Sequence, residues 1–348
     1  MSLGGTRSVG LSLGLLSAVS FGTSGPVGKS LIDSGFSPLQ AVWVRICGAA
    51  VVLLALVVVL RGRAALGSVR RHWAPVLAYA LVAIAMCQAL YFIAASRLPV
   101  GVAILLEFTG PVLVVGWLGL VRRQVVSRNA YVGVLIALCG LACVVQIWSG
   151  VRLDAVGVAA GLGAACGNAG YFLIIDRLAG SVDALVLTSG GMGVAALALV
   201  PLAAPWRAPW HLLAHSVPVG SHQSPGWLLA GALVLVSTVV AYLAGAGAVM
   251  RLSAPVAAGV AYIEAVAASL VAWAALGERL TPVQLTGGVI VLVGAFTAQR
   301  AVDARGQTEA SYSGEPEVID GSRERPAQSE GTEAITPSAP PLYAGNGS

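Results

Sequence analysis

The sequence predicts an all-α integral membrane protein with ten transmembrane helices, arranged as two inverted five-helix repeats and followed by a disordered cytoplasmic C-terminal tail. Three observations carry this prediction: the composition, a series of long apolar segments and an internal repeat. Of the 348 residues, 57% are hydrophobic and only 10% are charged, and the mean hydropathy is +0.86. A soluble domain usually carries about 25% charged residues because its surface must face water. The composition therefore excludes an ordinary soluble domain.

Apolar segments of membrane-spanning length recur along the chain. A bilayer core is about 30 Å thick and needs about 20 apolar residues per helix. Glycines, prolines and charged clusters mark the boundaries between such segments. Spans are expected at about 8–28, 38–60, 73–95, 99–120, 130–148, 155–175, 183–203, 226–248, 254–276 and 281–299. Beyond about residue 301 the chain is rich in Ser, Glu, Pro and Gly, which predicts disorder.

An internal repeat relates the two halves of the chain. When the sequence is shifted by 154 residues, the segment 97–140 aligns without a gap on 251–294. The expected domains are a first five-helix repeat at 8–148, a second at 155–300 and a tail at 301–348. Because five is an odd number, the second repeat must enter the membrane upside down. Inverted repeats are typical of secondary transporters, whose substrate site lies near the bilayer midplane between the halves.

The distribution of Lys and Arg predicts the orientation. Cytoplasmic loops retain an excess of these residues. With the N-terminus inside, the dense arginine clusters at 61–71 and 122–128 both fall on the cytoplasmic side. We therefore expect a multi-pass protein of the bacterial-type inner membrane with both termini in the cytoplasm.

Other features argue against several classes of protein. The five cysteines lie in apolar segments without the spacing of metal ligands, and no basic stripe is interleaved with aromatic residues. We expect no metal, no cofactor and no nucleic-acid partner. His211 and His215 have the spacing of a metal pair, but the glutamate of the zinc-protease motif is missing. An intramembrane enzyme and a passive channel stay as alternatives from other classes.

Three ionisable residues lie within the predicted spans: Arg45, Glu107 and Glu264. Inserting each charged side chain at the centre of a transmembrane helix costs about 2.5–3.5 kcal/mol, unless an opposite charge pairs with it or water reaches it. The two glutamates occupy equivalent helices of the two repeats. At 1.5 Å per residue, Arg45 and Glu107 lie about 10 Å and 12 Å below the outer surface, so a pair across a shared cavity is permitted. The alternatives are a static ion pair, or an arginine that extends to the interface.

The residues after Glu107 favour a functional role for it. Pro111 has no N–H, so the Glu107 carbonyl loses its helical partner, and Gly110 adds a flexible point beside it. The sequence predicts a kink there. Burial disfavours the charged form of a carboxylate, which suits it to bind and release protons and predicts proton coupling. Further polar and aromatic candidates, each more often a partner of another helix than a ligand contact, are Trp43, Gln88, Tyr91, Asn168, Tyr171 and Tyr242.

At these residues a resemblance to a known family emerges. The run Ala-Ile-Leu-Leu-Glu-Phe-Thr-Gly-Pro at 103–111 resembles a segment of bacterial threonine/homoserine exporters. These belong to the EamA-type drug/metabolite transporter superfamily, which the chain resembles over about residues 8–300. Gly-Lys-Ser-Leu at 28–31 and Arg45 are similar to the first two helices of that group. Gly-Glu-Arg-Leu-Thr-Pro at 277–282 resembles the superfamily's turn after the ninth helix.

The resemblance implies export of a small polar metabolite, an amino acid such as threonine or homoserine, by proton antiport with alternating access. Drug efflux and metabolite uptake by the same fold are alternatives, and an aromatic content of 6% favours a metabolite. One residue departs from the family: Ala265 stands where a proline usually follows the glutamate of the ninth span, so a kink there lacks its usual cause. The expected partners are the substrate, protons and the lipid bilayer, and a homodimer is left open.

Overall fold

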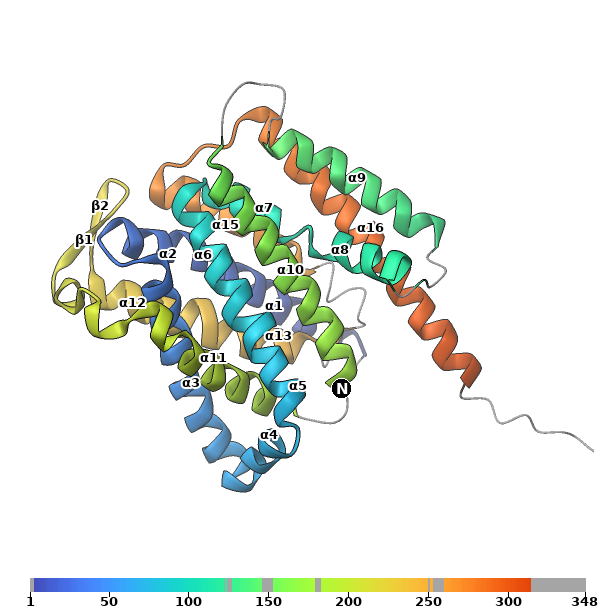
Figure 1. Ribbon diagram of the computed structural model, residues 1–348, viewed down its shortest axis with the longest axis horizontal. Helices are drawn as coiled ribbons and strands as arrows, with labels where there is room; N and C mark the ends of the chain where they lie inside the picture. Colours follow the sequence, from blue (N-terminus) through green and yellow to red (C-terminus); the bar gives the residue numbers. More distant parts are fainter. Residues whose placement is uncertain are drawn as a thin grey trace, which may run out of the picture. The chain divides into compact units, whose positions relative to one another are not determined.

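The computed structural model describes residues 3–121, 123, 127–145, 153–178, 183–249, 251–252 and 260–313. The predicted start of the ninth span, 254–259, and the tail from 314 onward lie outside these residues. Within them the chain is almost wholly helical (Figure 1). Six helical segments are long and apolar enough to cross a membrane by length and composition, and three shorter apolar helices accompany them.

The helices of the first half, residues 8–148, follow the predicted spans closely. They are α1 (Leu3–Gly22), α2 (Ser24–Asp33), α3 (Pro38–Arg61), η1 (Arg63–Leu66), α4 (Gly67–Arg71), α5 (Trp73–Ala78), η2 (Tyr79–Met86), α6 (Cys87–Arg97), α7 (Val100–Glu107), α8 (Gly110–Gly116), η3 (Trp117–Val121) and α9 (Arg128–Val145).

The second half, residues 155–300, repeats this pattern with a longer loop in its middle. Its elements are α10 (Ala155–Leu178), α11 (Ala184–Ala203), η4 (Pro205–Arg207), η5 (Trp210–Ala214), β1 (Ser216–Val219), β2 (His222–Pro225), α12 (Gly226–Val234), η6 (Leu235–Val240), α13 (Ala241–Val249), α15 (Ile263–Leu276) and α16 (Pro282–Ser313).

Two helices begin with the same local device. At the start of α3, the Ser37 hydroxyl accepts from the Gln40 N–H, and the Gln40 side chain accepts from the Ser37 N–H. Thr281 and Gln284 make the same reciprocal pair at the start of α16. Such a capping box satisfies N–H groups that a helix start leaves without partners, so a Ser/Thr-Pro-x-Gln pattern fixes both starts.

Several spans are irregular at membrane depth. The first span breaks at Thr23, between α1 and α2, and the fourth breaks at Phe108 and Thr109, between α7 and α8. The segments η2, η3 and η6 are π-helical. Irregular backbone at this depth is tolerated where protein or a watery cavity satisfies it, and π-helical turns occur often at functional sites.

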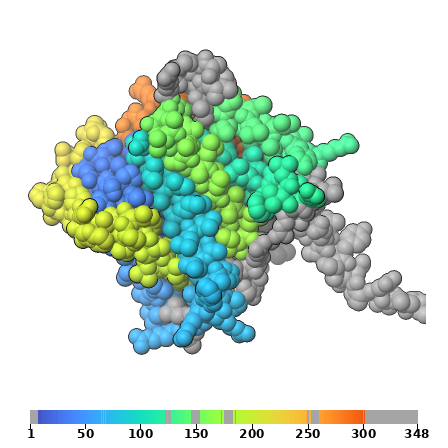
Figure 2. All heavy atoms as spheres, viewed as in Figure 1, coloured from blue at the N-terminus to red at the C-terminus, as the bar shows by residue number. Residues whose placement is uncertain are grey.

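The two halves pack against each other along several helix pairs. Helix α3 packs on α11, α1 packs on α13 and α15, and α10 packs on α6, α7 and α8. Figure 2 shows α10 (green) beside α6 (cyan) on one face. Large apolar side chains on the outer faces are exposed, such as Val59 at 80% and Leu197 at 74%. Lipid would cover such side chains in a membrane.

The fifth and tenth spans, α9 and α16, meet backbone to backbone (Figure 1). A Cβ added at Gly140 would lie 2.5 Å from the Val291 nitrogen, and one added at Gly133 would lie 2.5 Å from the Ala298 nitrogen. Glycines on both helices therefore permit an approach that any larger residue would prevent. Close approach of this kind is a common way to join helices in membranes.

Two features depart from the sequence prediction. The loop between α11 and α12 contains the hairpin β1–β2, in which Val219 pairs with His222 around a turn at Gly220. The loop's turn residues gave too weak a signal to predict strands. In addition, α16 continues to Ser313, although disorder was predicted from about 301. Ala, Arg, Gln and Glu in that stretch favour a helix that is already nucleated.

Candidate functional site

Seven predicted site residues gather in one region inside the bundle. Arg45, Glu107 and Glu264 interact electrostatically with one another, and Tyr91 and Tyr242 lie within range of their charges. Gln88 and Asn168 bond directly to members of this group. The residues come from α3 (Arg45), α6 (Gln88 and Tyr91), α7 (Glu107), α10 (Asn168), α13 (Tyr242) and α15 (Glu264). Both halves of the chain therefore contribute to the region.

Arg45 is almost completely buried, with 3% of its surface exposed. Its Nε donates to the Thr238 hydroxyl at 2.9 Å, one Nη to the Gln88 side-chain oxygen, and the other Nη to the Ser237 carbonyl at 3.4 Å. The guanidinium also lies over the Phe92 ring, 5.8 Å from its centroid. Every one of these partners is electrically neutral.

The direct Glu107–Arg45 ion pair that the depth estimate permitted is not formed. Within the described part of the chain, no carboxylate oxygen lies within 4.0 Å of the guanidinium. The amide, hydroxyl and carbonyl oxygens of α6 and η6 occupy its donors instead. Arg45 is thus a buried cation without an adjacent anion, which is costly unless something compensates the charge.

Glu107 ends α7 at the predicted break. Its side-chain oxygen accepts from the Cys87 thiol at 3.4 Å, and its backbone carbonyl accepts from the Asn168 side-chain amide at 3.4 Å. The second contact satisfies the carbonyl that Pro111 leaves without a helical partner. Gly110 permits it, because a Cβ there would lie 3.0 Å from the Asn168 nitrogen. The helix break at Phe108 and Thr109 lies at the position of the predicted kink.

Glu264 lies in the first turn of α15, directly after a break at Tyr262. A helix start favours an acidic side chain because its dipole is positive there. The break occurs although Ala265 replaces the usual proline, so the proline is not required. Helix α1 closes on this turn at Gly22, where a Cβ would lie 2.8 Å from the Ala268 nitrogen.

The Tyr91 side chain places a hydroxyl group in this region. Its hydroxyl is buried and has no hydrogen-bond partner among the described residues. Gly25 makes room for it, because a Cβ at that position would collide with the hydroxyl oxygen. A buried polar group without a partner costs about 1–3 kcal/mol. A ligand or water that reaches the region would therefore bind there favourably. Tyr242, on the other side, packs edge-on against Phe21 with ring centroids 4.9 Å apart.

Sequence reasoning missed four residues that contact the site. Cys87 was assigned to the apolar core, but its thiol bonds to Glu107. Phe92, Ser237 and Thr238 contact Arg45. Ser237 and Thr238 were detectable as adjacent hydroxyl residues in an otherwise apolar span. No comparable signal distinguished Cys87 or Phe92 from ordinary core residues.

No cluster of three or more His, Cys, Asp or Glu side chains suited to a metal occurs in the part of the chain that the structure describes. His211 and His215 lie in η5 and just after it, with ring centroids 6.2 Å apart. A ring nitrogen of His215 instead bonds with the His211 carbonyl at 2.7 Å. The pair therefore forms a local turn contact in an exposed loop.

Comparison with known proteins identifies similar sequences. The profile of the EamA-like transporter family matches the chain twice, over residues 8–146 and 155–298. The threonine/homoserine exporter RhtA of Escherichia coli (strain K12) is 31% identical over 199 residues, which cover 56% of this chain and 61% of RhtA. The uncharacterized transporter YwfM of Bacillus subtilis (strain 168) is 26% identical over 247 residues, which cover 70% of this chain and 79% of YwfM.

A solved structure has a similar fold. A protein of known crystal structure superposes with a TM-score of 0.55 at 20% sequence identity, over 86% of this chain and 99% of that chain. At this identity the likeness concerns the fold alone. The two matches to the family model agree with a chain built from two copies of one unit.

Proposed function

The chain belongs to the EamA-like transporter family, and we propose that it exports a small polar amino acid in exchange for protons, by alternating access across a bacterial-type inner membrane. It is a multi-pass membrane transporter and not an enzyme. The observation that carries the proposal is the region formed by Arg45, Glu107 and Glu264. Two carboxylates and one buried guanidinium lie together inside an apolar bundle, on helices from both halves.

Glu107 is the proposed proton-binding group. It terminates a broken helix, and among the described residues its side chain receives the weak Cys87 thiol donor alone. A carboxylate in such surroundings has little to stabilise its negative charge, so protonation and deprotonation can follow access to water. Glu264 occupies the equivalent helix of the other half and interacts electrostatically with Glu107. A proton bound by one carboxylate therefore affects the charge state of the other.

Arg45 is the proposed binding group for the substrate carboxylate. A guanidinium has five N–H donors, and three of them are engaged by Thr238, Gln88 and Ser237. One N–H remains on each terminal nitrogen, and each can donate to an oxygen of a substrate carboxylate. The ammonium group of an amino acid would complement Glu107 or Glu264. RhtA, a relative of this chain, is named as a threonine/homoserine exporter, which supports an amino acid of this kind.

Alternating access follows from the two halves. We place both termini in the cytoplasm, because the arginine clusters then lie inside. The second half runs in the opposite direction to the first, and rocking of one half against the other exposes the central region to each side by turns. The short segments and breaks around α7, α8 and α15 are the points at which such motion needs the least rearrangement.

Transport by the purified protein tests the proposal. Proteoliposomes receive an imposed pH gradient, and movement of labelled threonine is measured in the direction opposite to proton flow. The proposal predicts saturable flux that depends on the gradient and is lost in Glu107→Gln. Flux that does not saturate and ignores the gradient would indicate a channel instead. Transport of cationic drugs without any movement of amino acids would replace the proposed substrate.

A further inference from the structure

We propose that Lys29 and Glu278 form a gate that holds one end of the transporter closed until substrate or protons shift the two halves. This end carries the hairpin β1–β2, and we call it the hairpin end. The inference rests on the proposed alternating access, but it concerns residues outside the central region. It assigns to Glu278 a positioning role toward α7, the helix that bears Glu107.

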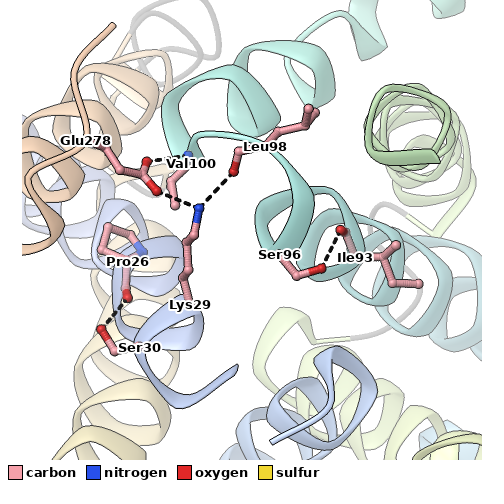
Figure 3. Close-up of polar contacts among 8 residues, drawn as sticks. All are labelled: Pro26, Lys29, Ser30, Ile93, Ser96, Leu98, Val100 and Glu278. Carbon is pink, nitrogen blue, oxygen red and sulfur yellow. Dashed lines mark hydrogen bonds and ion pairs between the residues drawn. The ribbon is translucent and has the colours of Figure 1, made fainter. Parts of the chain in front are cut away.

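The contact between the two residues is close and extends to the backbone (Figure 3). Lys29 Nζ lies 2.6 Å from Glu278 Oε1 and donates to the Leu98 carbonyl at 3.1 Å. The other oxygen of the same carboxylate, Oε2, accepts from the Val100 N–H at 2.7 Å. Glu278 therefore connects α2 to the first turn of α7 through both of its carboxylate oxygens.

This contact crosses the boundary between the two halves. Lys29, Leu98 and Val100 belong to the first half, whereas Glu278 follows α15 in the second half. Helices α7 and α15 meet closely beside it, because a Cβ at Gly101 would lie 2.8 Å from the Ser269 hydroxyl. Separation of the halves at the hairpin end must therefore break the ion pair and the Val100 hydrogen bond.

The pair also differs from the other ion pairs in the described residues. The side chains of Lys29 and Glu278 are 17% and 18% exposed, and their separation is 2.6 Å. The Arg97–Asp154 pair lies at 3.3 Å with side chains 46% and 40% exposed. Exposed pairs contribute little, about 0–1 kcal/mol, because water screens them. Burial and additional hydrogen bonds make Lys29–Glu278 the pair that can hold a conformation.

The internal repeat places uncharged residues at the positions equivalent to Lys29 and Glu278. The 154-residue shift that aligns the halves places Gln124 opposite Glu278. In the first helices a shift of 145 residues places Gly22 on Gly167 and Gly48 on Gly193, and the same shift places Ile174 opposite Lys29. At the opposite end the Arg61–Asp183 pair also joins the two halves, but its side chains are 55% and 41% exposed, so it contributes little. The more buried Lys29–Glu278 pair therefore biases the protein toward closure of the hairpin end. The resting transporter is therefore closed at the hairpin end.

Cys87 provides a reporter for the test, because it is buried beside Glu107. In a variant whose other four cysteines are replaced by alanine, a membrane-impermeant thiol reagent is applied to intact cells and to inverted vesicles. Lys29→Gln and Glu278→Gln should each raise the labelling rate about tenfold from the hairpin side. This is the change expected when the closed state loses about 1.4 kcal/mol. Lys29→Arg, which retains the charge, should label as slowly as the parent.

Arg97→Gln is the matched control, because it removes an exposed ion pair at the same end and should leave the labelling rate unchanged. An unchanged rate in both Gln variants would overturn the gate. So would an equal rise from both sides of the membrane, or a rise in Arg97→Gln. Gel filtration identifies a variant that has not folded, and the second Gln variant then decides. Labelling requires no substrate, so failure of amino-acid flux with the predicted labelling would refute the proposed function and leave the gate standing.

Discussion

Arg45→Lys separates the geometry of the guanidinium from its charge. Lysine retains one positive charge but presents it on a single nitrogen, whereas Arg45 distributes its donors over Thr238, Gln88 and Ser237. Two further N–H groups of Arg45 are left for the proposed substrate carboxylate. We expect the variant to fold and to bind the amino-acid substrate more weakly. The apparent KM should rise while the amount of protein in the membrane stays near that of the parent.

The magnitude follows from the hydrogen bonds at stake. A lysine ammonium that replaces the guanidinium loses at least one charge-assisted hydrogen bond to the substrate carboxylate. Hydrogen bonds to charged groups contribute about 1.5–3 kcal/mol. Because 1.4 kcal/mol corresponds to a factor of ten, the apparent KM should rise about 10- to 150-fold.

Uptake of labelled threonine into proteoliposomes over a range of concentrations measures this change. Arg61→Lys is the matched control, because Arg61 is 55% exposed and lies 3.4 Å from Asp183 in an ion pair at the end of α3. Its KM should stay within about twofold of the parent, since exposed pairs contribute little. An Arg45→Lys variant with parental KM would refute the assignment of the carboxylate to Arg45.

Three further predictions concern other parts of the molecule. Glu107→Gln should abolish export driven by a pH gradient, while exchange of labelled for unlabelled substrate persists. If the variant retains gradient-driven flux, Glu107 is not the proton-binding group. Glu264→Ala should reduce transport more than deletion of residues 314–348, and equal losses in the same assay would contradict this. Gly140→Ala should lower the melting temperature and reduce the free energy of unfolding by about 1–3 kcal/mol, because the added Cβ would collide with the backbone of α16. The matched Gly231→Ala, with open space around its Cβ, should leave it unchanged or raised.

The position of the candidate site along the helices could be predicted from the sequence. Pro111 lacks the N–H that the Glu107 carbonyl needs, so a break near Glu107 follows from covalent chemistry alone. The rarity of charges in the spans identified Arg45, Glu107 and Glu264 without any structure. Both arguments rely on local chemistry or on distance along a helix axis, and these are available in a single sequence.

The partners of these residues could not be predicted in the same way. Depth along the axis places Arg45 and Glu107 at similar levels, but it does not give the rotation of each helix about its axis. That rotation directs Arg45 toward Gln88 and Thr238 and leaves Glu107 beside Cys87. The partnership of Lys29 and Glu278 depends on the packing of residues 249 positions apart, which no local pattern specifies.

The glycine contacts between α9 and α16 have a mechanical consequence. These helices belong to different halves, and at Gly133 and Gly140 their backbones touch with no side chain between them. If α9 slid along α16, a Cβ or carbonyl of one helix would be forced into the backbone of the other. The contact between these two helices therefore acts as a hinge. We therefore expect relative motion of the halves to be a tilt about this contact, with larger displacements on the helices that lie farther from it.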